Sequence, residues 1–290
     1  MPVDHYENFP VASVLLPRQL RPAVETIYQF ARSADDIADE GMLSDAERLH
    51  QLQQYDDELL RIMHGKTTQT ELFGKLTAVI QHHQLSVEPF RQLISAFRQD
   101  VEKKRYASYA ELLDYCQRSA DPVGHIMLEL YDKADPQRLQ ASSCICTALQ
   151  LINFLQDVAI DWKKERIYLP LEDLTHFSVH EHDIAGATLS REWQHLMQFQ
   201  IERTRALMQQ GAWLATSLPG RIGWELRLVV QGGLRILDKI EATNGDIFHQ
   251  RPTLNAKDWA IMLIRAFGMK RRYPFPDDTL PERNRKPGKV

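Results

Sequence analysis

The sequence is informative first through what it lacks. Its three cysteines, Cys116, Cys144 and Cys146, do not have the spacing of a zinc site, so we expect free thiols in a reducing compartment. No stretch reaches 18 uncharged apolar residues, and the first residues are polar and acidic. We therefore expect neither a membrane-spanning segment nor a secretory signal. These absences predict a cytoplasmic protein.

Other absences concern partners and fold class. The net charge of −4 argues against a nucleic-acid partner, and no GxGxxG segment indicates a nucleotide-binding fold. β-Branched residues do not alternate over any sustained stretch, and there is no repeat of 20–50 residues. We therefore predict one all-α bundle over residues 1–273. Residues 274–290, rich in proline and charge, are predicted to be a mobile tail.

Capping signals and apolar periodicity predict where several helices begin and end. Ser44 with Glu47, and Ser108 with Glu111, have the spacing of capping boxes that open helices. The helix that starts near residue 108 meets a proline and a glycine at 121–124, where we expect a kink. Residues 163–188 are predicted to form a loop region, and further helices are expected over 136–162, 189–216, 220–243 and 255–269.

A column of polar residues lies on the helix predicted over 136–162. Asn153, Asp157 and Asp161 follow one another at intervals of four residues, which places them on one face. Their neighbours are apolar enough to bury most of this helix. Since buried carboxylates need a compensating partner, the column predicts a bound cation.

A second acidic cluster lies at residues 31–40. Asp35 and Asp39 are one helical turn apart, Arg32 is one turn earlier, and Asp36 is on an adjacent face. Such a cluster alone is most simply a solvated helix end. Two helices that carry oxygen ligands at this spacing, however, suit Mg²⁺ bridged to a diphosphate. The pair of clusters predicts metal-assisted departure of a diphosphate beside an apolar cavity that excludes water.

The segments ARSADDIAD, at 31–39, and NFLQDVAIDWKKERIYLP, at 153–170, together resemble the squalene and phytoene synthase family. These enzymes join prenyl diphosphates head to head, and the resemblance covers roughly residues 5–260. It implies an isoprenoid synthase bundle around a central hydrophobic cavity. It also implies six Mg²⁺ ligands: Asp35, Asp36, Asp39, Asn153, Asp157 and Asp161. Of these, Asp35, Asp39 and Asp157 would act in catalysis. The implied substrate contacts are Tyr28, Arg32, Arg166, Tyr168 and Arg251.

Two departures from the family pattern bear on the reaction. Arg118 stands where the family's YCxYVAGxVG segment has a tyrosine assigned to cyclopropanation, and Gln156 replaces the arginine of NxxRD. These departures resemble the hydroxysqualene synthase branch of bacterial hopanoid pathways. That branch, a diphosphate lyase, converts presqualene diphosphate and water to hydroxysqualene and diphosphate. Arg118 is then expected to bind diphosphate or pair with a carboxylate, and Gln156 is expected to act in catalysis.

Several alternatives stay open at this point. The water that such a reaction captures would be positioned by Gln156, by His125 or by the departing diphosphate. Within the family, the runner-up is a presqualene diphosphate, squalene or phytoene synthase that condenses two prenyl diphosphates. Outside it, a helical scaffold would leave the buried column unexplained, and a two-metal hydrolase would favour histidine ligands, which neither cluster contains.

Three further features each have two interpretations. Lys163 and Lys164 either approach the phosphates or end a solvated helix, and the pair Gly232–Gly233 serves either a hydrocarbon chain or close helix packing. Basic residues at 270–272 stand among apolar ones, which suits peripheral contact with an anionic membrane at its inner face. The sequence does not predict an oligomeric state.

Overall fold

Helices make up most of residues 16–274, the part of the chain that the computed structural model describes. No strand occurs within this range, where one isolated parallel bridge joins Arg105 to Ile167. After a short 3-10 turn, the helices in order are α1 (Arg21–Asp39), α2 (Asp45–Met63), α3 (Glu71–His83), α4 (Glu88–Glu102), α5 (Tyr109–Ser119), α6 (Asp121–Leu130), α7 (Pro136–Lys163), α8 (Leu171–His176), α9 (Glu181–Ala185), α10 (Arg191–Gly211), α11 (Leu214–Ser217), α12 (Gly220–Ala242) and α13 (Ala256–Arg272). The predicted all-α fold is confirmed, whereas the predicted tail beyond residue 274 lies outside the described residues.

The local signals behave largely as the sequence predicts. Ser44 and Glu47 form a complete capping box at the start of α2. Ser108 caps α5, but the carboxylate of Glu111 accepts a bond from the Ala107 amide instead of returning to the cap. The expected kink is a full break, since α5 ends at Ser119 and α6 begins at Asp121 with a proline in its first turn.

Two predicted ranges need correction. The region 163–188 is not only loop, because it contains the short helices α8 and α9. The helix expected over 189–216 ends at Gly211, and the separate turn α11 follows. A Cβ added at Gly211 would lie 2.3 Å from the carbonyl oxygen of Ala141, so α10 and α7 are in close backbone contact there.

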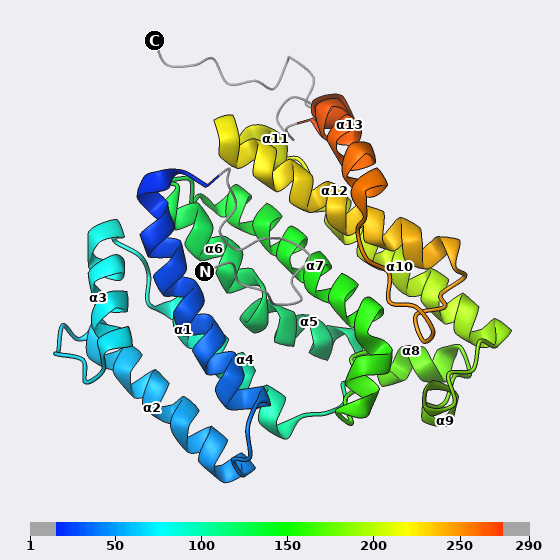
Figure 1. The fold of residues 1–290 in the computed structure, drawn as a ribbon, viewed down its shortest axis with the longest axis horizontal. Helices are drawn as coiled ribbons and strands as arrows, with labels where there is room; N and C mark the ends of the chain where they lie inside the picture. The colour runs from blue at the N-terminus through cyan, green and yellow to red at the C-terminus, as the bar shows by residue number, and fades with distance from the viewer. Residues whose placement is uncertain (1–15, 275–290) are drawn as a thin grey trace.

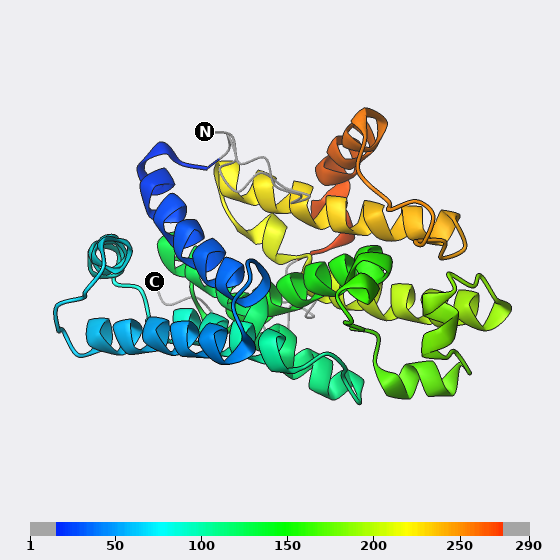
Figure 2. The same cartoon turned by 60° about the horizontal axis from the view of Figure 1, so that its bottom comes forward.

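The longest helix, α7, is the centre of the bundle. It packs against α5, α6, α10 and α12, while α4, α5 and α6 connect it to α1 (Figures 1 and 2). One large hydrophobic cluster joins helices α1 to α4 and part of α6, and another joins α7 to the C-terminal helices. This arrangement leaves the inner faces of α1 and α7 turned toward a shared space.

The composition of α7 qualifies the prediction that nothing spans a membrane. This helix is long and apolar enough to cross one, and half of its most apolar 18-residue window is buried inside the protein. Buried residues such as Ile145, Ile152 and Leu155 pack against the C-terminal helices. The apolar character of α7 is therefore accounted for by its place in the core.

The buried carboxylate of Asp121 should make stability depend on pH. It accepts a hydrogen bond from Thr147 Oγ1 at 2.8 Å, and burial raises its pKa to about 6. Because the folded state holds this proton more tightly than the unfolded state, stability should fall as pH rises from about 4 to 6. At pH 7 we expect Asp121→Asn to increase the free energy of unfolding, measured in urea, by roughly 2 kcal/mol. The variant should also lose this pH dependence.

The matched control is Asp114→Asn on the neighbouring helix, where the Asp114 side chain is 66% exposed. It should leave the pH profile of urea unfolding unchanged. An Asp121→Asn variant with the parent's slope between pH 4 and 7 would contradict the expectation.

Candidate active site

Carboxylates from α1, α4 and α7 meet around one polar cavity of about 200 Å³, which we call the acidic cavity. It contains most members of both predicted clusters. From α1 it has Asp35 and Asp39, and from α7 it has the whole polar column. The structure thus brings together seven of the predicted residues: Asp35, Asp39, Asn153, Asp157, Asp161, Arg166 and Tyr168. Their roles toward a metal or substrate stay predictions.

Arginine and lysine side chains neutralise part of this negative charge. Arg166 holds Asp39 through two hydrogen bonds of 2.7 and 3.0 Å, and Lys164 adds a third of 3.0 Å. Arg251 holds both oxygens of Asp157, with Nη2 at 3.1 Å from Oδ2. The cavity therefore offers both carboxylates and cations, the two kinds of group that a metal-bound diphosphate needs.

A similar set of ion pairs lies along α1 beside the acidic cavity. Arg32 donates to Asp35 at 3.0 Å and lies 2.7 Å from both Asp36 and Glu40. Asp36 does not line the acidic cavity, in contrast to its neighbour Asp35. The i, i+4 rule explains the difference, since only Asp35 and Asp39 share the inner face.

The carboxylates of the acidic cavity differ in their proton affinity. Burial raises the pKa of Asp35 to about 6, and the negative charge of Asp39 adds to the effect. Burial and the neighbouring Asp157 raise the pKa of Asp161 to about 7. For Asp39, burial opposes ionisation, but the bonds from Arg166 and Lys164 outweigh it and lower its pKa to about 2. Asp39 is thus firmly ionised, whereas Asp35 and Asp161 take protons more readily.

A short extended segment after α7 directs Arg166 into the cavity. Glu165 takes a left-handed conformation with φ of 60° and ends the helical direction of the chain. The Ile167 amide then donates to the Lys104 carbonyl at 3.0 Å, which aligns this segment with the chain after α4. Because side chains alternate in an extended segment, Arg166 and Tyr168 point to the cavity while Ile167 packs into the core.

Asp100, near the end of α4, is a cavity residue that sequence reasoning missed. Its carboxylate is 8% exposed at the residue level and accepts bonds from Tyr115 at 2.8 Å and Tyr168 at 3.4 Å. Its backbone carbonyl also accepts a bond from Arg166 at 3.2 Å. Burial raises the pKa of Asp100 to about 6. The sequence signal that could have indicated its burial is its position four residues after Ala96, on the apolar face of the helix.

Tyrosines and a stacked phenylalanine form the wall beside Asp100. The rings of Phe154 and Tyr168 stack with centroids 3.8 Å apart, and Tyr115 lies 6.0 Å from Tyr168. Sequence reasoning also missed Tyr115 and Gln150 as cavity residues. Gln150 stands one turn before Asn153, so the spacing of the column itself contained the signal.

Two apolar hollows follow one another beside the acidic cavity, and the first of them adjoins it. The first, of about 420 Å³, lies between α1, α4 and α6 and shares Asp35 with the acidic cavity. Tyr28 and Arg32, both predicted substrate contacts, line this hollow. The second, of about 250 Å³, lies between α6, α7, α11 and α12 and shares Val123 and Met127 with the first. The space available to a ligand thus has one polar end and two apolar parts.

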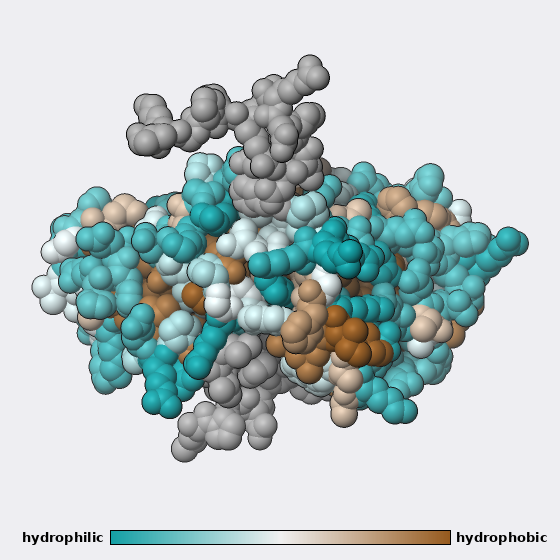
Figure 3. All heavy atoms as spheres, turned by 90° about the horizontal axis from the view of Figure 1, so that it is seen from above, coloured by the Kyte–Doolittle hydropathy of each residue, from teal (hydrophilic) through white to brown (hydrophobic). Residues whose placement is uncertain are grey.

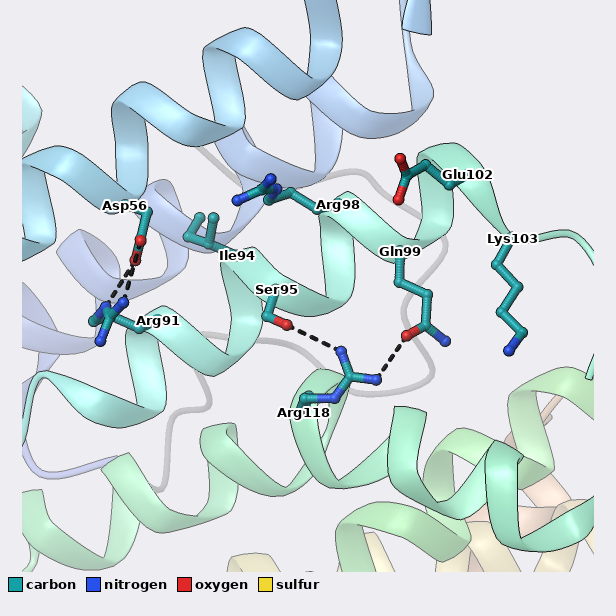
Figure 4. Close-up of a pocket in the computed structure, with 9 residues that line it drawn as sticks. All are labelled: Asp56, Arg91, Ile94, Ser95, Arg98, Gln99, Glu102, Lys103 and Arg118. Atoms are coloured by element: carbon teal, nitrogen blue, oxygen red, sulfur yellow. Dashed lines mark hydrogen bonds and ion pairs between the residues drawn. The ribbon is translucent and has the colours of Figure 1, made fainter. Parts of the chain in front are cut away.

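The structure does not bring Arg118 to the acidic cavity. This residue lines a separate surface hollow of about 560 Å³, where it bonds Ser95 at 3.0 Å and Gln99 at 2.6 Å (Figure 4). It also donates to Asp114 at 2.7 Å, one turn earlier on α5. The predicted pairing with a carboxylate is present, whereas the expected contact with diphosphate is not supported by this position.

Gln156 and His125 also lie away from the acidic cavity. Gln156 is 1% exposed, and its amide donates to the carbonyl of Pro252 at 2.7 Å. His125 bonds the hydroxyl of Ser143 at 2.9 Å between α6 and α7. The position of Gln156 indicates that it anchors the loop that carries Arg251, next to Asp157, and so supports the site from behind.

Replacing Gln156 tests this supporting role. Gln156→Met keeps the volume but leaves the Pro252 carbonyl without this donor, so we expect a loss of roughly 1–3 kcal/mol in unfolding free energy. Because Arg251 then becomes less well positioned, turnover should fall about 10- to 100-fold. Urea unfolding and steady-state rates measure the two effects. Gln198→Met, on the exposed face of α10, is the control, and parent-like stability in Gln156→Met would argue against the anchor.

The structure also bears on the lysine pair at 163–164 and the glycine pair at 232–233, each of which had two interpretations. Lys164 reaches the acidic cavity, whereas Lys163 is absent from its lining. A Cβ on Gly233 would lie about 3 Å from Ile152 and Met208, at 3.0 and 2.9 Å, so this glycine permits close packing of α12 on α7 and α10.

The donor set of the acidic cavity fits a hard divalent cation. Its carboxylate and amide oxygens come from opposite walls, and the described residues include no histidine or cysteine in that lining. Within residues 16–274 no three acidic, histidine or cysteine side chains are already arranged as a metal site. Arg166 and Lys164 bond the carboxylate of Asp39, and Arg251 bonds that of Asp157, so these oxygens already have cationic partners.

A helical bundle in which an acidic, cation-lined cavity adjoins apolar hollows defines a protein suited to amphiphiles with an anionic head. The family model described as "Squalene/phytoene synthase" matches residues 3–258 of this chain. The chain therefore belongs to the squalene/phytoene synthase family, whose members process prenyl diphosphates.

Relatives with different activities are similar to this chain. A phytoene synthase from Arthrospira platensis is 30% identical over 261 residues, which cover 86% of this chain and 84% of that protein. A hydroxysqualene synthase from Rhodopseudomonas palustris is 33% identical over 238 residues, covering 81% and 80%. Sequence similarity thus defines the family but not the reaction.

Solved structures support the fold. Squalene synthase HpnC from Alicyclobacillus acidocaldarius has a TM-score of 0.77 and 36% identity, covering 83% of this chain and 90% of that one. A dehydrosqualene synthase in complex with a ligand has the same TM-score at 21% identity, covering 89% and 90%. The predicted isoprenoid synthase bundle is therefore confirmed.

Proposed function

We propose that this enzyme converts presqualene diphosphate and water to hydroxysqualene and diphosphate with the help of Mg²⁺. The observation that carries the proposal is the acidic cavity, which adjoins one apolar hollow that in turn adjoins a second. Presqualene diphosphate has one diphosphate head and two hydrocarbon arms, which matches that division of polar and apolar space. The hydroxysqualene synthases among the relatives, at 30% and 33% identity, add support.

The head of the substrate would bind among the cations of the acidic cavity. Arg166 and Lys164 line this cavity, and Arg251 bonds Asp157 from outside its lining. All three now bond carboxylates and would turn to phosphate oxygens when the ligand enters. The carboxylates they release, Asp39 and Asp157, would then be available together with Asp161 to hold Mg²⁺. Bound Mg²⁺ would supply charge withdrawal from the departing diphosphate.

The hydrocarbon arms would lie in the two apolar hollows. Val123 and Met127 of α6 line both hollows, so a branched ligand can pass from one to the other around this helix. Apolar walls exclude bulk water from the carbocation that ionisation leaves behind. Of the three earlier candidates for positioning the captured water, only the departing diphosphate would lie in the acidic cavity, since Gln156 and His125 do not line it.

One observation favours the runner-up, condensation of two prenyl diphosphates. Although Arg118 stands away from the cavity, Tyr115 of the same segment lines it and donates to Asp100. The departure at Arg118 therefore does not remove tyrosine from the site.

Product analysis separates the two activities. The purified protein is incubated with Mg²⁺ and either presqualene diphosphate or farnesyl diphosphate, and the extracted lipids are identified by mass spectrometry. We expect hydroxysqualene from presqualene diphosphate and no condensation product from farnesyl diphosphate. Head-to-head condensation of farnesyl diphosphate would replace the proposal with the runner-up. The lipid nature of either product also suits an enzyme that touches the membrane peripherally.

A further inference from the structure

Helix α13 leaves one face uncovered at the surface of the bundle. Its other face packs against α12, where the buried Asp258 accepts bonds of 2.7 Å from both Arg235 and Lys239. On the uncovered face, four large apolar side chains are exposed by 37 to 74%: Trp259, Leu263, Ile264 and Phe267. Seen from above, hydrophobic residues gather in a patch bordered by hydrophilic ones (Figure 3). A row of this size on a single helix is unusual for a surface exposed only to water.

Basic residues continue this face at the end of the helix. At about 100° per residue, the four apolar positions lie within an arc of about 140°, and Lys270 and Arg271 fall on the same arc. Among the described residues, no carboxylate forms an ion pair with Lys270 or Arg271, whereas Arg265 pairs with Asp238 at 2.7 Å. Exposed cations and apolar side chains therefore point in one direction.

We propose that α13 docks the protein on the surface of an anionic lipid bilayer. Ile264 and Phe267 would enter the boundary between headgroups and acyl chains, and Trp259 would lie at the headgroup level. Lys270 and Arg271 would meet the phosphates of anionic lipids. The exposed cations at the helix end, next to the apolar row, favour a layer of anionic headgroups above an apolar interior as the occupant.

The position of α13 connects this surface with the proposed substrate. The ring of Phe267 contacts that of Trp224 on α12, with centroids 4.8 Å apart. Ile222 and Leu226 of α12 line the second apolar hollow. One helix thus separates the docking face from that hollow, which would shorten the path of a hydrocarbon between bilayer and enzyme. This last step rests on the proposed function, whereas the docking itself does not.

Vesicle binding tests the proposal with the full chain. Sedimentation is measured with phosphatidylcholine vesicles and with vesicles that also contain phosphatidylglycerol, at low and high salt. We expect binding to the anionic vesicles to be at least tenfold tighter and to weaken with salt. Ile264→Glu/Phe267→Glu should abolish binding. Lys270→Gln/Arg271→Gln should weaken it about 30-fold, at about 1 kcal/mol for each.

Controls and contrary outcomes follow from the same experiment. Met42→Glu changes a fully exposed apolar side chain away from α13 and should bind as the parent does. Equal binding by the parent and the α13 variants, or no binding by the parent, would overturn the proposal. So would a dimer in analytical ultracentrifugation that dissociates when Phe267 is replaced.

Turnover measured in detergent keeps the two proposals distinct. The α13 variants should process detergent-dispersed presqualene diphosphate at the parent rate, since none of the replaced residues lines the acidic cavity. If neither the parent protein nor any variant acts on that substrate, while vesicle binding gives the expected results, the proposed function is wrong. The docking surface is then still supported.

Discussion

Asp157→Asn should reduce turnover on the order of 10³-fold while leaving the fold intact, because several kcal/mol of charge stabilisation depend on this carboxylate. Asp157 stands in the middle of the polar column, between Asn153 and Asp161, and lines the acidic cavity. The asparagine has nearly the same shape and still accepts a hydrogen bond from Arg251, which now holds both carboxylate oxygens. What it loses is the negative charge that attracts a divalent cation.

The measurements separate this loss from a general disturbance. Steady-state rates give the loss of turnover, and calorimetric titration with Mg²⁺ and inorganic diphosphate gives the loss of metal affinity. Circular dichroism and urea unfolding should resemble the parent within about 1 kcal/mol, because the replaced group is partly exposed to the cavity. Asp114→Asn, a carboxylate outside the cavity, should keep both activity and metal binding. An active Asp157→Asn enzyme would remove the second acidic cluster from the site.

Arg166→Gln should produce a second large effect, a loss of both stability and activity. Arg166 is 8% exposed and connects three elements through its bonds to Asp39 on α1 and the Asp100 carbonyl on α4. Without it, the partly buried Asp39 keeps only Lys164 as a counter-charge. Removing one partner of a buried ion pair costs about 3 kcal/mol or more. We expect the free energy of unfolding, measured in urea, to fall by that amount. Turnover should fall at least about 100-fold.

Two further variants identify the cause of this effect. Arg166→Lys keeps the charge but cannot make two parallel bonds to Asp39, so its stability and rate should lie between those of the parent and Arg166→Gln. Arg91→Gln breaks a comparable two-bond pair with Asp56, outside the acidic cavity, and should leave the rate unchanged. If Arg166→Gln and Arg91→Gln have equal effects on turnover, Arg166 has no special place in the site.

Several parts of the site were predictable because they depend on local spacing. Residues four apart on a helix share a face, so Asp35 with Asp39 and the column from Asn153 to Asp161 had to point together once their helices formed. Ser44 and Glu47 likewise determined the start of α2 through bonds within one turn. The two acidic segments also carried the resemblance by which the family was predicted.

Other parts depended on contacts between segments distant in sequence. Asp100 looks like an ordinary acidic residue near a helix end, and only the arrival of Tyr115, Tyr168 and Arg166 makes it a buried anchor. Gln156, adjacent to Asp157, faces away from the acidic cavity and bonds the loop before α13. Neighbours in sequence are about 100° apart around a helix, so proximity in the chain does not place two side chains in one cavity.

The sequence by itself determined the helical fold, the inner faces of α1 and α7 and the membership of the family, since periodicity and motif spacing are properties of each segment alone. The tertiary structure decided which of the remaining polar residues reach the acidic cavity. It turned Arg118 to a separate hollow, added Asp100 and Tyr115, and placed the exposed face of α13 beyond the wall of the second apolar hollow. The physical reason is that burial and charge pairing arise from packing between helices, which no single segment encodes.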